Sequence, residues 1–464
     1  MKHIALIVVV LALLLAAVPA LAQDEIPDLT VNHTACADGV DLTGQEIKLY
    51  HFGDLSGPYS FITQPLLAGF EDAAKYFNER GGICGATIAQ EFDDTAGVQD
   101  ATRAIYDRFS SLTPKPPIML LYASADAELL REQVAQDEIA ILISAGSVPG
   151  LYGEDGQTPG WIFGTNPLYA DQVGAMCDFL AANPDRFPNP VIGHISWEGA
   201  FGRSADTPES RAYCESVGVG YAGAEYFLPT ATDITGQVQN LLDAGANVLY
   251  TNSLASGPAL VAKTIVDMGI EDQVTFAGVN WALDTSVGLL GQATFGSDGL
   301  PSTNGLIGSL PFRWWTERAH PGIQVINAAA EAAQRPLTVR NIAYILAWAN
   351  MDTFIEAYIQ TGNRVGFDNI TGAAMKETLE TMVYDTMGGI QTIDFTGNRR
   401  ALSANRIAMM AYLGQDGQTP AGPNNPPLVV TAGERQLLVP ILVPMTDFAP
   451  APDLRPGGAD VPGM

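Results

Sequence analysis

The feature that most constrains the fold of this chain is a repeated alternation of short aliphatic runs with longer amphipathic segments. The first unit reads IKLYHFGD over residues 47–54, which predicts a strand, followed by a Ser-Gly-Pro turn and an amphipathic helix over 64–78. The same pattern predicts further strands at 86–92, 118–122, 140–143, 161–164, 191–196, 224–228, 248–251, 274–277 and 306–310. Because helices separate most of these strands, neighbouring strands are expected to run parallel. The alternation therefore predicts an α/β fold with mainly parallel sheets.

The last third of the chain follows a different pattern. Residues 323–361 favour helix and contain NIAYILAWANMDTFIEAYI, the longest amphipathic run. Two returning strands are expected in GGIQTIDF and RIAMMAYLG. Residues 446–464 are rich in Pro and Gly and carry too little apolar surface to fold alone, so we expect a disordered tail there. Because 464 residues exceed one compact domain of ordinary size, we expect two lobes.

The first 22 residues have the layout of a secretory signal peptide. Lys2 precedes an apolar run over 4–18, and Ala20-Leu21-Ala22 leads into a polar segment, so we expect cleavage after Ala22. The alternative is an uncleaved membrane anchor, but the apolar run is shorter than the ~20 residues that a bilayer needs. The mature chain is therefore expected to be soluble and exported to the periplasm or another extracytoplasmic space.

The cysteine content fits an oxidising compartment. The chain has an even number of cysteines, Cys36, Cys84, Cys177 and Cys214. Their spacing matches no zinc pattern, since no C-x-x-C occurs and the histidines are scattered. Of the possible pairings we favour Cys36 with Cys84 and Cys177 with Cys214, because each pair then stays within one proposed lobe.

Charge and motifs argue against several classes of function. The chain carries 23 basic and 51 acidic residues, a formal charge of −28, which disfavours a nucleic acid partner. GVGYAG at 218–223 matches the dinucleotide fingerprint, but a predicted helix precedes it and a strand follows, the reverse of the required order. Neither a Walker motif nor a G-x-S-x-G elbow occurs. Asp93-Asp94 would suit a metal or acid/base chemistry, although such pairs more often cap a helix. We expect no metal, no cofactor and no catalytic residue.

Small hydroxyl-bearing residues gather where the predicted strands end. The stretches FGDLSGPYS, LLYASADAE, ILISAGS and LYTNS each close a strand with serine, glycine or asparagine. In open parallel sheets, ligands bind beyond the carboxyl ends of the strands, where loops and helix N-termini supply unpaired amides. A single serine at such a place is more often a helix cap or a turn residue. Several strand ends of this kind together favour a binding site for an anionic or carbonyl group.

With these stretches the chain resembles the extracytoplasmic substrate-binding proteins of ABC importers for branched-chain amino acids, which have the type I periplasmic binding fold. The resemblance covers about 47–413 and is carried by IKLYHFGDLSGPYSFITQPLLAGFEDAAKYFNERGGICG, ILISAGSVPGLYG, TDITGQVQNLLDAGANVLYTNSLASGPALVAKTIVDMGI and VTFAGVNW. It implies two Rossmann-like lobes joined by a three-crossover hinge. The implied segments are an N-terminal extension at 23–45, an N-terminal lobe of 46–165 plus 311–390, a C-terminal lobe of 166–310 plus 391–445, and crossovers near 165–169, 310 and 390–396.

The resemblance also implies a ligand site between the lobes. Members of the family grip a ligand carboxylate through a serine hydroxyl and backbone groups of the first lobe, and the matching positions are Ser124, Ala145 and Ser147. The remaining site positions, by motif match or proximity, are Tyr59, Ile62, Tyr169, Phe201, Ser253, Asn280 and Trp281. The aromatic members of this set favour a ligand with a flat or apolar body and an amide or carboxylate at one end.

One position departs from the family pattern. Asn280 stands where amino-acid binders place an acid that pairs with the ligand ammonium. Because an unpaired buried ammonium is costly, an ordinary α-amino acid is disfavoured unless Glu198 or Asp284 supplies the missing charge.

The function implied by the resemblance is capture of a small molecule without covalent chemistry. A monomeric, exported receptor would close its two lobes over the solute and pass it to an ABC permease in the membrane. Three alternatives remain open at this point: a cleft that is only a gap between lobes, a ligand-sensing receptor subunit of the same fold, and an exported α/β hydrolase.

Overall fold

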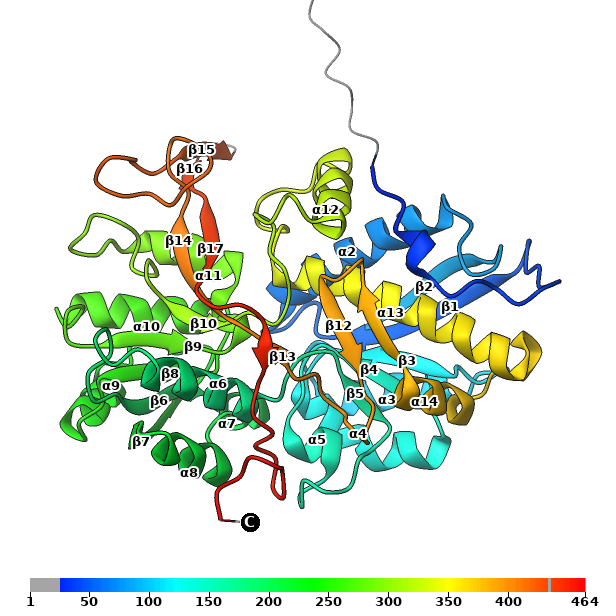
Figure 1. Ribbon diagram of the computed structural model, residues 1–464, viewed down its shortest axis with the longest axis horizontal. Helices are drawn as coiled ribbons and strands as arrows, with labels where there is room; N and C mark the ends of the chain where they lie inside the picture. Colours follow the sequence, from blue (N-terminus) through cyan, green and yellow to red (C-terminus); the bar gives the residue numbers. More distant parts are fainter. Residues whose placement is uncertain (1–25, 433–434, 464) are drawn as a thin grey trace, which may run out of the picture.

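The computed structural model describes residues 26–432 and 435–463. The signal peptide predicted over residues 1–22 lies outside these residues. Two separate β-sheets form the centres of two lobes that lie side by side, with helices packed around each sheet (Figure 1). The predicted α/β architecture with two parallel-sheet lobes is confirmed.

The first lobe is built on a five-stranded sheet in the order β2-β1-β3-β4-β5. The strands of this sheet are β1 (Glu46–Gly53), β2 (Thr87–Asp94), β3 (Ile118–Leu121), β4 (Ala140–Ile143) and β5 (Ile162–Gly164). Every neighbouring pair runs parallel. Strands β3 and β4 are buried along their whole length. Burial on both faces is the reason that their sequences read as continuous aliphatic runs.

The helices of the first lobe come from two distant parts of the chain. They are α2 (Ser60–Asn78), α3 (Gln99–Ser110), α4 (Ser124–Asp137), α5 (Val148–Tyr152), α12 (Pro321–Ala332), α13 (Ile342–Val365) and α14 (Gly372–Thr381), with short 3-10 turns η1 (Leu29–Asn32) and η4 (Phe367–Asn369). The long helix α13 is buried over most of its length. It packs closely on α2 at Gly69, where a Cβ atom would come within 2.7 Å of the Ala347 Cβ. A larger residue at position 69 would push these two helices apart.

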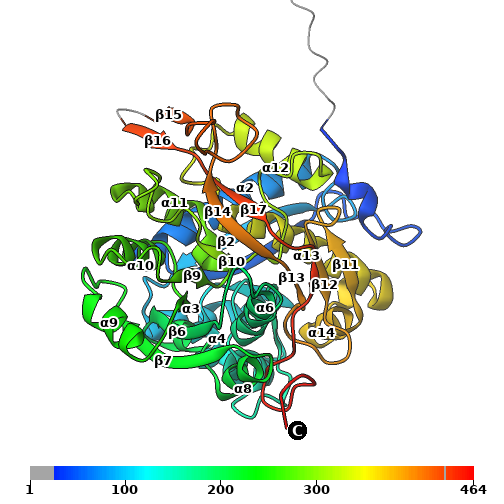
Figure 2. The same cartoon turned by 60° about the vertical axis from the view of Figure 1, so that its left-hand side comes forward.

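The second lobe contains a seven-stranded sheet in the order β17-β14-β10-β9-β8-β6-β7. Its strands are β6 (Val191–Trp197), β7 (Gly220–Phe227), β8 (Val248–Thr251), β9 (Thr275–Gly278), β10 (Ile307–Ser309), β14 (Ile407–Tyr412) and β17 (Pro440–Pro444). Its helices are α6 (Tyr169–Ala181), α7 (Ala200–Arg203), α8 (Pro208–Ser216), α9 (Thr235–Asp243), α10 (Ser256–Asp267) and α11 (Thr285–Leu290), with 3-10 turns η2 (Asn280–Leu283) and η3 (Gly291–Ala293). Strands β14 and β17 join the sheet antiparallel. The hairpin of β15 (Val429–Ala432) and β16 (Arg435–Leu438) projects from this end of the lobe (Figures 1 and 2).

The chain crosses between the lobes at three places that lie together. The first follows β5, where the Asn166 carbonyl accepts a hydrogen bond from the backbone N–H of Leu402, in the third crossover, at 3.3 Å. The second and third are linked by a hydrogen bond of 3.2 Å between the side chains of Asn405 and Ser309. These polar ties hold the three crossovers side by side as one hinge.

The third crossover corrects the prediction made from the sequence. GGIQTIDF does form a strand, β12 (Gln391–Asp394), but it pairs antiparallel with β11 (Val383–Thr386) in a local hairpin of the first lobe. The Phe395 ring then packs on Phe163 of β5 with centroids 5.0 Å apart. Residues 391–401 therefore pack with the first lobe, and the chain crosses at 402–406 rather than at 390–396.

Both predicted disulfides are present, and each lies within one lobe. Cys36 and Cys84 join the N-terminal extension to the segment after α2, with Cα atoms 5.9 Å apart. Cys177 of α6 and Cys214 of α8 are joined in the second lobe, with Cα atoms 5.3 Å apart.

The C-terminal segment is packed, so the prediction of a disordered tail over 446–464 is wrong for its described residues. Its strand β18 (Ala449–Pro450) pairs with β13 (Ala404–Asn405). Leu454 is fully buried, and its backbone N–H donates to Asp171 of α6 at 2.8 Å. The Arg455 guanidinium lies over the Tyr152 ring of α5, 4.7 Å from its centroid. The tail thus contacts the second lobe and the first lobe in successive residues, running between them in Figure 1.

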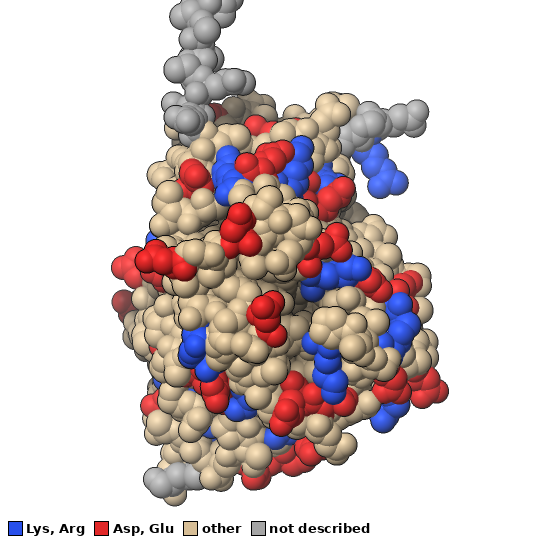
Figure 3. Space-filling view, turned by 90° about the vertical axis from the view of Figure 1, so that its right-hand side faces the viewer, with Lys and Arg blue, Asp and Glu red and all other residues tan. Residues whose placement is uncertain are grey.

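The surface carries the acidic surplus in a dispersed form. Figure 3 shows acidic and basic side chains interspersed over one face of the molecule, not gathered into one continuous patch. Over residues 26–432 and 435–463, none of the helices has the length and hydropathy of a membrane span.

Candidate functional site

A cavity of about 180 Å³ lies between the two lobes. The first lobe contributes the segments that follow β1, β2, β3 and β4, which are the carboxyl ends of parallel strands. The second lobe contributes the segment from Glu198 to Phe201, Leu254 and Trp281, and Tyr169 lines the cavity at the first crossover. The site therefore has two walls from different lobes, at the edge of the first sheet where the sequence placed it.

The first-lobe wall presents an unused hydroxyl at a helix N-terminus. Ser124 is the first residue of α4 and is 2% exposed; its Oγ meets no hydrogen-bond geometry within the described part of the chain, and a polar group close to it is the Tyr169 hydroxyl, whose burial-raised pKa it partly lowers. The residue before it, Ala123, gives the helix no side-chain cap. Since the first backbone N–H groups of a helix lack partners inside the helix, this wall offers donors to a carbonyl or carboxylate oxygen. Ser144, on the neighbouring strand end, is held in place by the Asn350 amide, which donates to its Oγ at 2.7 Å.

Aromatic rings close the cavity from the second lobe. The Tyr169 and Phe201 rings meet edge to face, with centroids 5.2 Å apart. The Trp281 Nε1–H donates to the Tyr169 hydroxyl at 3.1 Å. Burial raises the pKa of Tyr169, so its hydroxyl stays protonated at neutral pH. This cluster offers flat apolar surface and little polarity to the body of a ligand.

Three acids line the cavity, and they differ in burial and in the groups that bind their carboxylate oxygens. The Asp54 carboxylate accepts the backbone N–H groups of Gly57 at 2.5 Å and Tyr59 at 2.9 Å. Glu198 is half exposed and pairs with Arg203 at 3.0 Å. Asp126 is buried, and burial raises its pKa to about 6. Asp54 is buried as well, but backbone N–H groups occupy both of its oxygens, whereas one oxygen of the Asp126 carboxylate accepts only from Thr102.

A buried histidine supports the wall from behind. Tyr122 lines the cavity, and its hydroxyl lies 2.5 Å from Nδ1 of His51 on β1. Burial lowers the pKa of His51 to about 3, so the ring is neutral at physiological pH. The pair fixes the Tyr122 ring without adding charge to the site.

Seven of the ten ligand positions predicted from the sequence line the cavity. They are Tyr59, Ile62, Ser124, Ala145, Tyr169, Phe201 and Trp281. The predicted set missed Asp54, Tyr122 and Asp126, although all three stand in or beside the strand-end motifs that the sequence displays.

The other three predicted positions do not line the cavity. Ser147 is the N-cap of α5, and its Oγ bonds to the Glu128 carboxylate. The Ser253 Oγ is paired with Thr251 Oγ1 at 2.6 Å. Asn280 is fully buried, with its backbone N–H donating to Gln172 Oε1 at 2.9 Å.

Asp284, one of the two acids considered as a replacement for the missing charge, has a structural role. It caps α11 through the Ser286 N–H at 3.0 Å. Its other oxygen accepts the Ile342 N–H, also at 3.0 Å, at the start of α13. Burial raises the pKa of this carboxyl. It does not reach the cavity.

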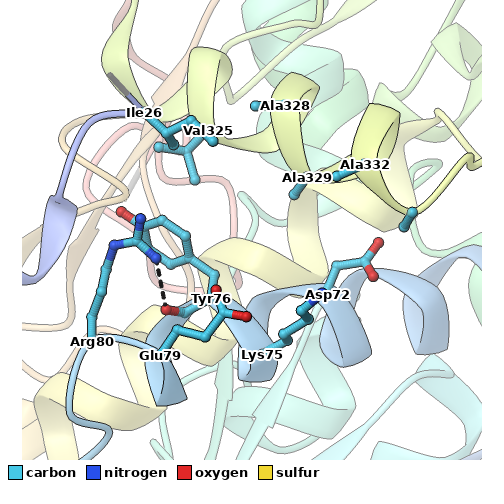
Figure 4. Close-up of a pocket in the computed structure, with 11 residues that line it drawn as sticks. Ile26, Asp72, Lys75, Tyr76, Glu79, Arg80, Val325, Ala328, Ala329 and Ala332 are labelled. Atoms are coloured by element: carbon cyan, nitrogen blue, oxygen red, sulfur yellow. Dashed lines mark hydrogen bonds between the residues drawn. The ribbon is translucent and has the colours of Figure 1, made fainter. Parts of the chain in front are cut away.

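A second hollow of about 130 Å³ lies between α2 and α12 in the first lobe (Figure 4). One wall of this hollow is a row of alanines and Val325 on α12, which faces Tyr76 of α2 and Arg80 just after α2. Arg80 already donates to the Tyr76 carbonyl at 3.1 Å and stacks over the Tyr76 ring. Because both walls belong to one lobe, hinge closure would not shape this hollow around a solute.

Known proteins share the architecture. Residues 46–418 match the family of periplasmic binding proteins. The Leu/Ile/Val-binding protein homolog 3 of Brucella melitensis is 21% identical over 309 residues, which are 62% of this chain and 79% of that protein. A branched-chain amino acid ABC transporter structure from Thermus thermophilus with bound valine aligns with a TM-score of 0.68 at 18% identity, covering 88% of this chain and 98% of that one. A solute binding protein from R. palustris in complex with 4-hydroxybenzoate aligns with a TM-score of 0.66 at 15% identity, covering 88% and 98%.

Proposed function

Since the chain belongs to the periplasmic binding protein family, we propose that it is the extracytoplasmic solute-binding protein of an ABC importer. Its ligand is a small amino-acid-like, amide or carboxylate molecule, held between the lobes by hinge closure and delivered to a membrane permease. The observation that carries this proposal is the interlobe cavity, which has a polar first-lobe wall and an aromatic second-lobe wall. Groups from both lobes then contact one ligand, which is what couples binding to closure.

The size of the cavity supports a small solute. Its volume is about 180 Å³. For scale, an engineered protein cavity of ~150 Å³ accommodates benzene. The space therefore suits one six-membered ring or one branched aliphatic chain with a single polar end.

The polar end is proposed to lie against the first lobe. The free Ser124 Oγ and the N-terminus of α4 supply donors for an oxygen of the ligand, and the Ala145 backbone lies on the same wall. Tyr59, Phe201 and Trp281 are then left to enclose the apolar body. The ligands named for the structural neighbours, valine and 4-hydroxybenzoate, share this division into an oxygen-bearing end and an apolar body.

Export of the chain is part of the proposal. Two disulfides indicate an oxidising compartment, and the N-terminal sequence is typical of a cleaved signal peptide. Delivery of the solute to a permease requires that location.

The cavity favours binding over hydrolysis. A serine nucleophile needs an adjacent base, and no histidine is among the described residues that line the cavity around Ser124. A ligand-sensing receptor subunit would have the same cleft and would differ only in its protein partner. Uptake by cells is therefore the measurement that distinguishes import from sensing.

A thermal-shift screen of the mature protein against amino acids, amides and carboxylates tests the proposal. A solute at ~100 times its Kd should raise the free energy of unfolding by ~2.7 kcal/mol. Uptake of the labelled hit by cells with and without the gene then separates import from sensing. If no compound in any of these classes raised the melting temperature, solute binding in this cleft would be refuted.

A further inference from the structure

We propose that Asp126 binds the nitrogen-bearing end of the solute, so that the cleft selects primary amides, amidines and amino compounds over simple carboxylates. This inference rests on the proposed function, because it assumes that a small solute occupies the interlobe cavity. It assigns the missing donor-binding acid to the first lobe, whereas the sequence pattern had pointed to the second.

The first step is the difference between the three acids of the cavity. Both oxygens of Asp54 accept backbone N–H groups of the turn that follows β1. Glu198 is 52% exposed at its side chain and already has Arg203 as a partner. Neither acid is both free and shielded from water, so neither is placed to dominate recognition of a buried solute.

The second step is the state of Asp126. Its side chain lies in the first turn of α4, and the residue is 7% exposed. Oδ1 accepts a hydrogen bond from Thr102 Oγ1 of α3 at 2.9 Å. Oδ2 has no hydrogen-bond partner within the described residues, although Asp126 lines the cavity. A buried carboxylate with one satisfied oxygen and one open oxygen is a receptor for a donor.

The third step is the charge of the lining. No lysine, arginine or histidine is among the described residues that line the cavity. A solute that carries only a carboxylate would add a negative charge beside Asp54, Asp126 and Glu198 without a compensating cation. A neutral amide avoids this repulsion, and a cationic nitrogen reverses it.

The fourth step is the position of Ser124, two residues before Asp126 on the same turn of α4. The Ser124 Oγ is buried, unpartnered and in the same cavity, so it can donate to an oxygen of the solute. An acceptor oxygen at Ser124 and an N–H donor at Asp126 match a group in which oxygen and nitrogen are close neighbours. A primary amide has this arrangement on one carbon, and an amino acid has it on two.

The pH dependence of binding follows from the groups that surround Asp126. Asp54 and Tyr59 approach it from the segment after β1, Thr102 from α3, and Glu198 faces the cavity from the second lobe. The pKa of Asp126 is raised to about 6, chiefly by burial. A cationic solute stabilises the ionised form, so its affinity should rise as pH increases through 6 and level off above.

Calorimetric titration of the mature protein with two probe series tests the assignment. Benzamidine, benzamide and benzoate share a planar shape and differ in charge, and leucine, leucinamide and 4-methylpentanoate form the aliphatic counterpart. One of the two series, aromatic or aliphatic, should fit the cavity better. Within that series, the wild type at pH 8 should bind the nitrogen-bearing compounds at least tenfold more tightly than the carboxylate. In Asp126→Asn, the ratio of the affinity for the nitrogen-bearing compound to that for the carboxylate should fall at least tenfold. The rise of this ratio between pH 5 and pH 8, expected in the wild type, should disappear in the variant.

Two further variants keep the test interpretable. Glu132→Gln removes an acid from the same helix at a side chain that is 85% exposed, and it should bind like the wild type. Thr102→Val keeps the Asp126 carboxylate but removes its hydrogen bond, so the pH midpoint of binding should move upward. Tightest binding of the carboxylate, unchanged in Asp126→Asn, would overturn this inference while leaving solute binding intact. Failure of every class in the broader screen would overturn the proposed function and this inference together.

Discussion

Tyr59 of the first lobe and Trp197 of the second lobe meet across the cleft, with ring centroids 6.0 Å apart and ring planes inclined at 72°. The contact joins the turn before α2 to the end of β6, and it lies beside the solute cavity. This edge-to-face contact joins the two lobes next to the solute cavity.

Replacing Trp197 should shift the hinge equilibrium toward the open form. The Tyr59–Trp197 pair contributes about 1 kcal/mol beyond the area it buries, so Trp197→Phe should weaken solute binding about fivefold. Trp197 does not itself line the cavity, which makes a direct contact effect small. Small-angle scattering of the free protein should show a larger radius of gyration than in the wild type. Trp161→Phe, in the first lobe, is the control, and equal scattering curves for all three proteins would argue against this role for Trp197.

Two serines that look alike in the sequence should behave differently. Ser124→Ala removes a donor of the cavity, and affinity for a solute with an amide oxygen should fall about twofold to tenfold, since a neutral hydrogen bond contributes ~0.5–1.5 kcal/mol. Ser147→Ala removes the cap of α5 and should cost ~1 kcal/mol of stability with affinity unchanged. Calorimetric binding and thermal melting on both variants measure the contrast. A loss of affinity in Ser147→Ala but not in Ser124→Ala would indicate that the ligand contacts Ser147 instead.

Asn280 provides a test of a position that the sequence assigned to the ligand. Its side-chain amide is buried, and neither polar atom has a partner within the described residues. Since a buried unsatisfied amide costs ~1–3 kcal/mol, Asn280→Leu should leave the melting temperature unchanged or raise it. Affinity for the screened solute should stay within about twofold, because Asn280 does not line the cavity. A large loss of affinity in a variant that still folds would show that Asn280 contacts the ligand after all.

The buried His51 should make the protein less stable in mild acid. Its pKa falls from 6.5 to about 3 on folding because the ring is buried, so the unfolded chain binds a proton that the folded chain does not between pH 6.5 and 3. The free energy of unfolding then falls by ~1.4 kcal/mol per pH unit as pH decreases through this window. Other buried groups titrate in the same range, so the difference between wild type and His51→Gln isolates the effect. Urea unfolding at pH 6 and pH 4 should show a shallower decline in the variant, and equal slopes would contradict the assignment.

Removal of the C-terminal tail should ease opening of the lobes. A chain that ends at residue 451 loses the contact of Leu454 with α6 and of Arg455 with the Tyr152 ring. Amide hydrogen exchange should increase in 152–157 of the first lobe, where Pro456 packs on Gly156. A chain that ends at residue 460 keeps these contacts and serves as control. Identical exchange in both shortened chains would show that the tail does not restrain this region.

The strands of both lobes were predictable because they are set by local pattern. Strand β4 reads AILI and is buried at every position; the run is too short for a helix and ends at Ser-Ala-Gly-Ser, which favours a buried strand. The crossover at 402–406 was not predictable in the same way. A Gly388-Gly389 turn with positive φ folds β12 back on β11, so a run that reads as a returning strand stays in its own lobe.

The tail and the site show why long-range contacts escape a sequence pattern. Leu454 is buried because it packs on Asp171 and Gly174 of α6, far away in the sequence, and nothing in its Pro- and Gly-rich neighbourhood indicates that contact. Ser147 precedes a proline at the start of α5, which is a signature of a helix cap and was available in the sequence. Asp126 resembles any acid in the first turn of a helix, and only the fold shows that it faces a cavity without cations.

Each disulfide lies within one lobe, and neither joins the two lobes across the hinge. The bridged cysteines are 48 and 37 residues apart in sequence, and on a chain-entropy basis each bridge stabilises its own lobe by ~4 kcal/mol. Reductant should therefore lower the stability of each lobe separately. The angle between the lobes should still depend on the non-covalent contacts between them. Oxidation therefore stabilises each lobe separately, and no disulfide between the lobes limits the hinge motion.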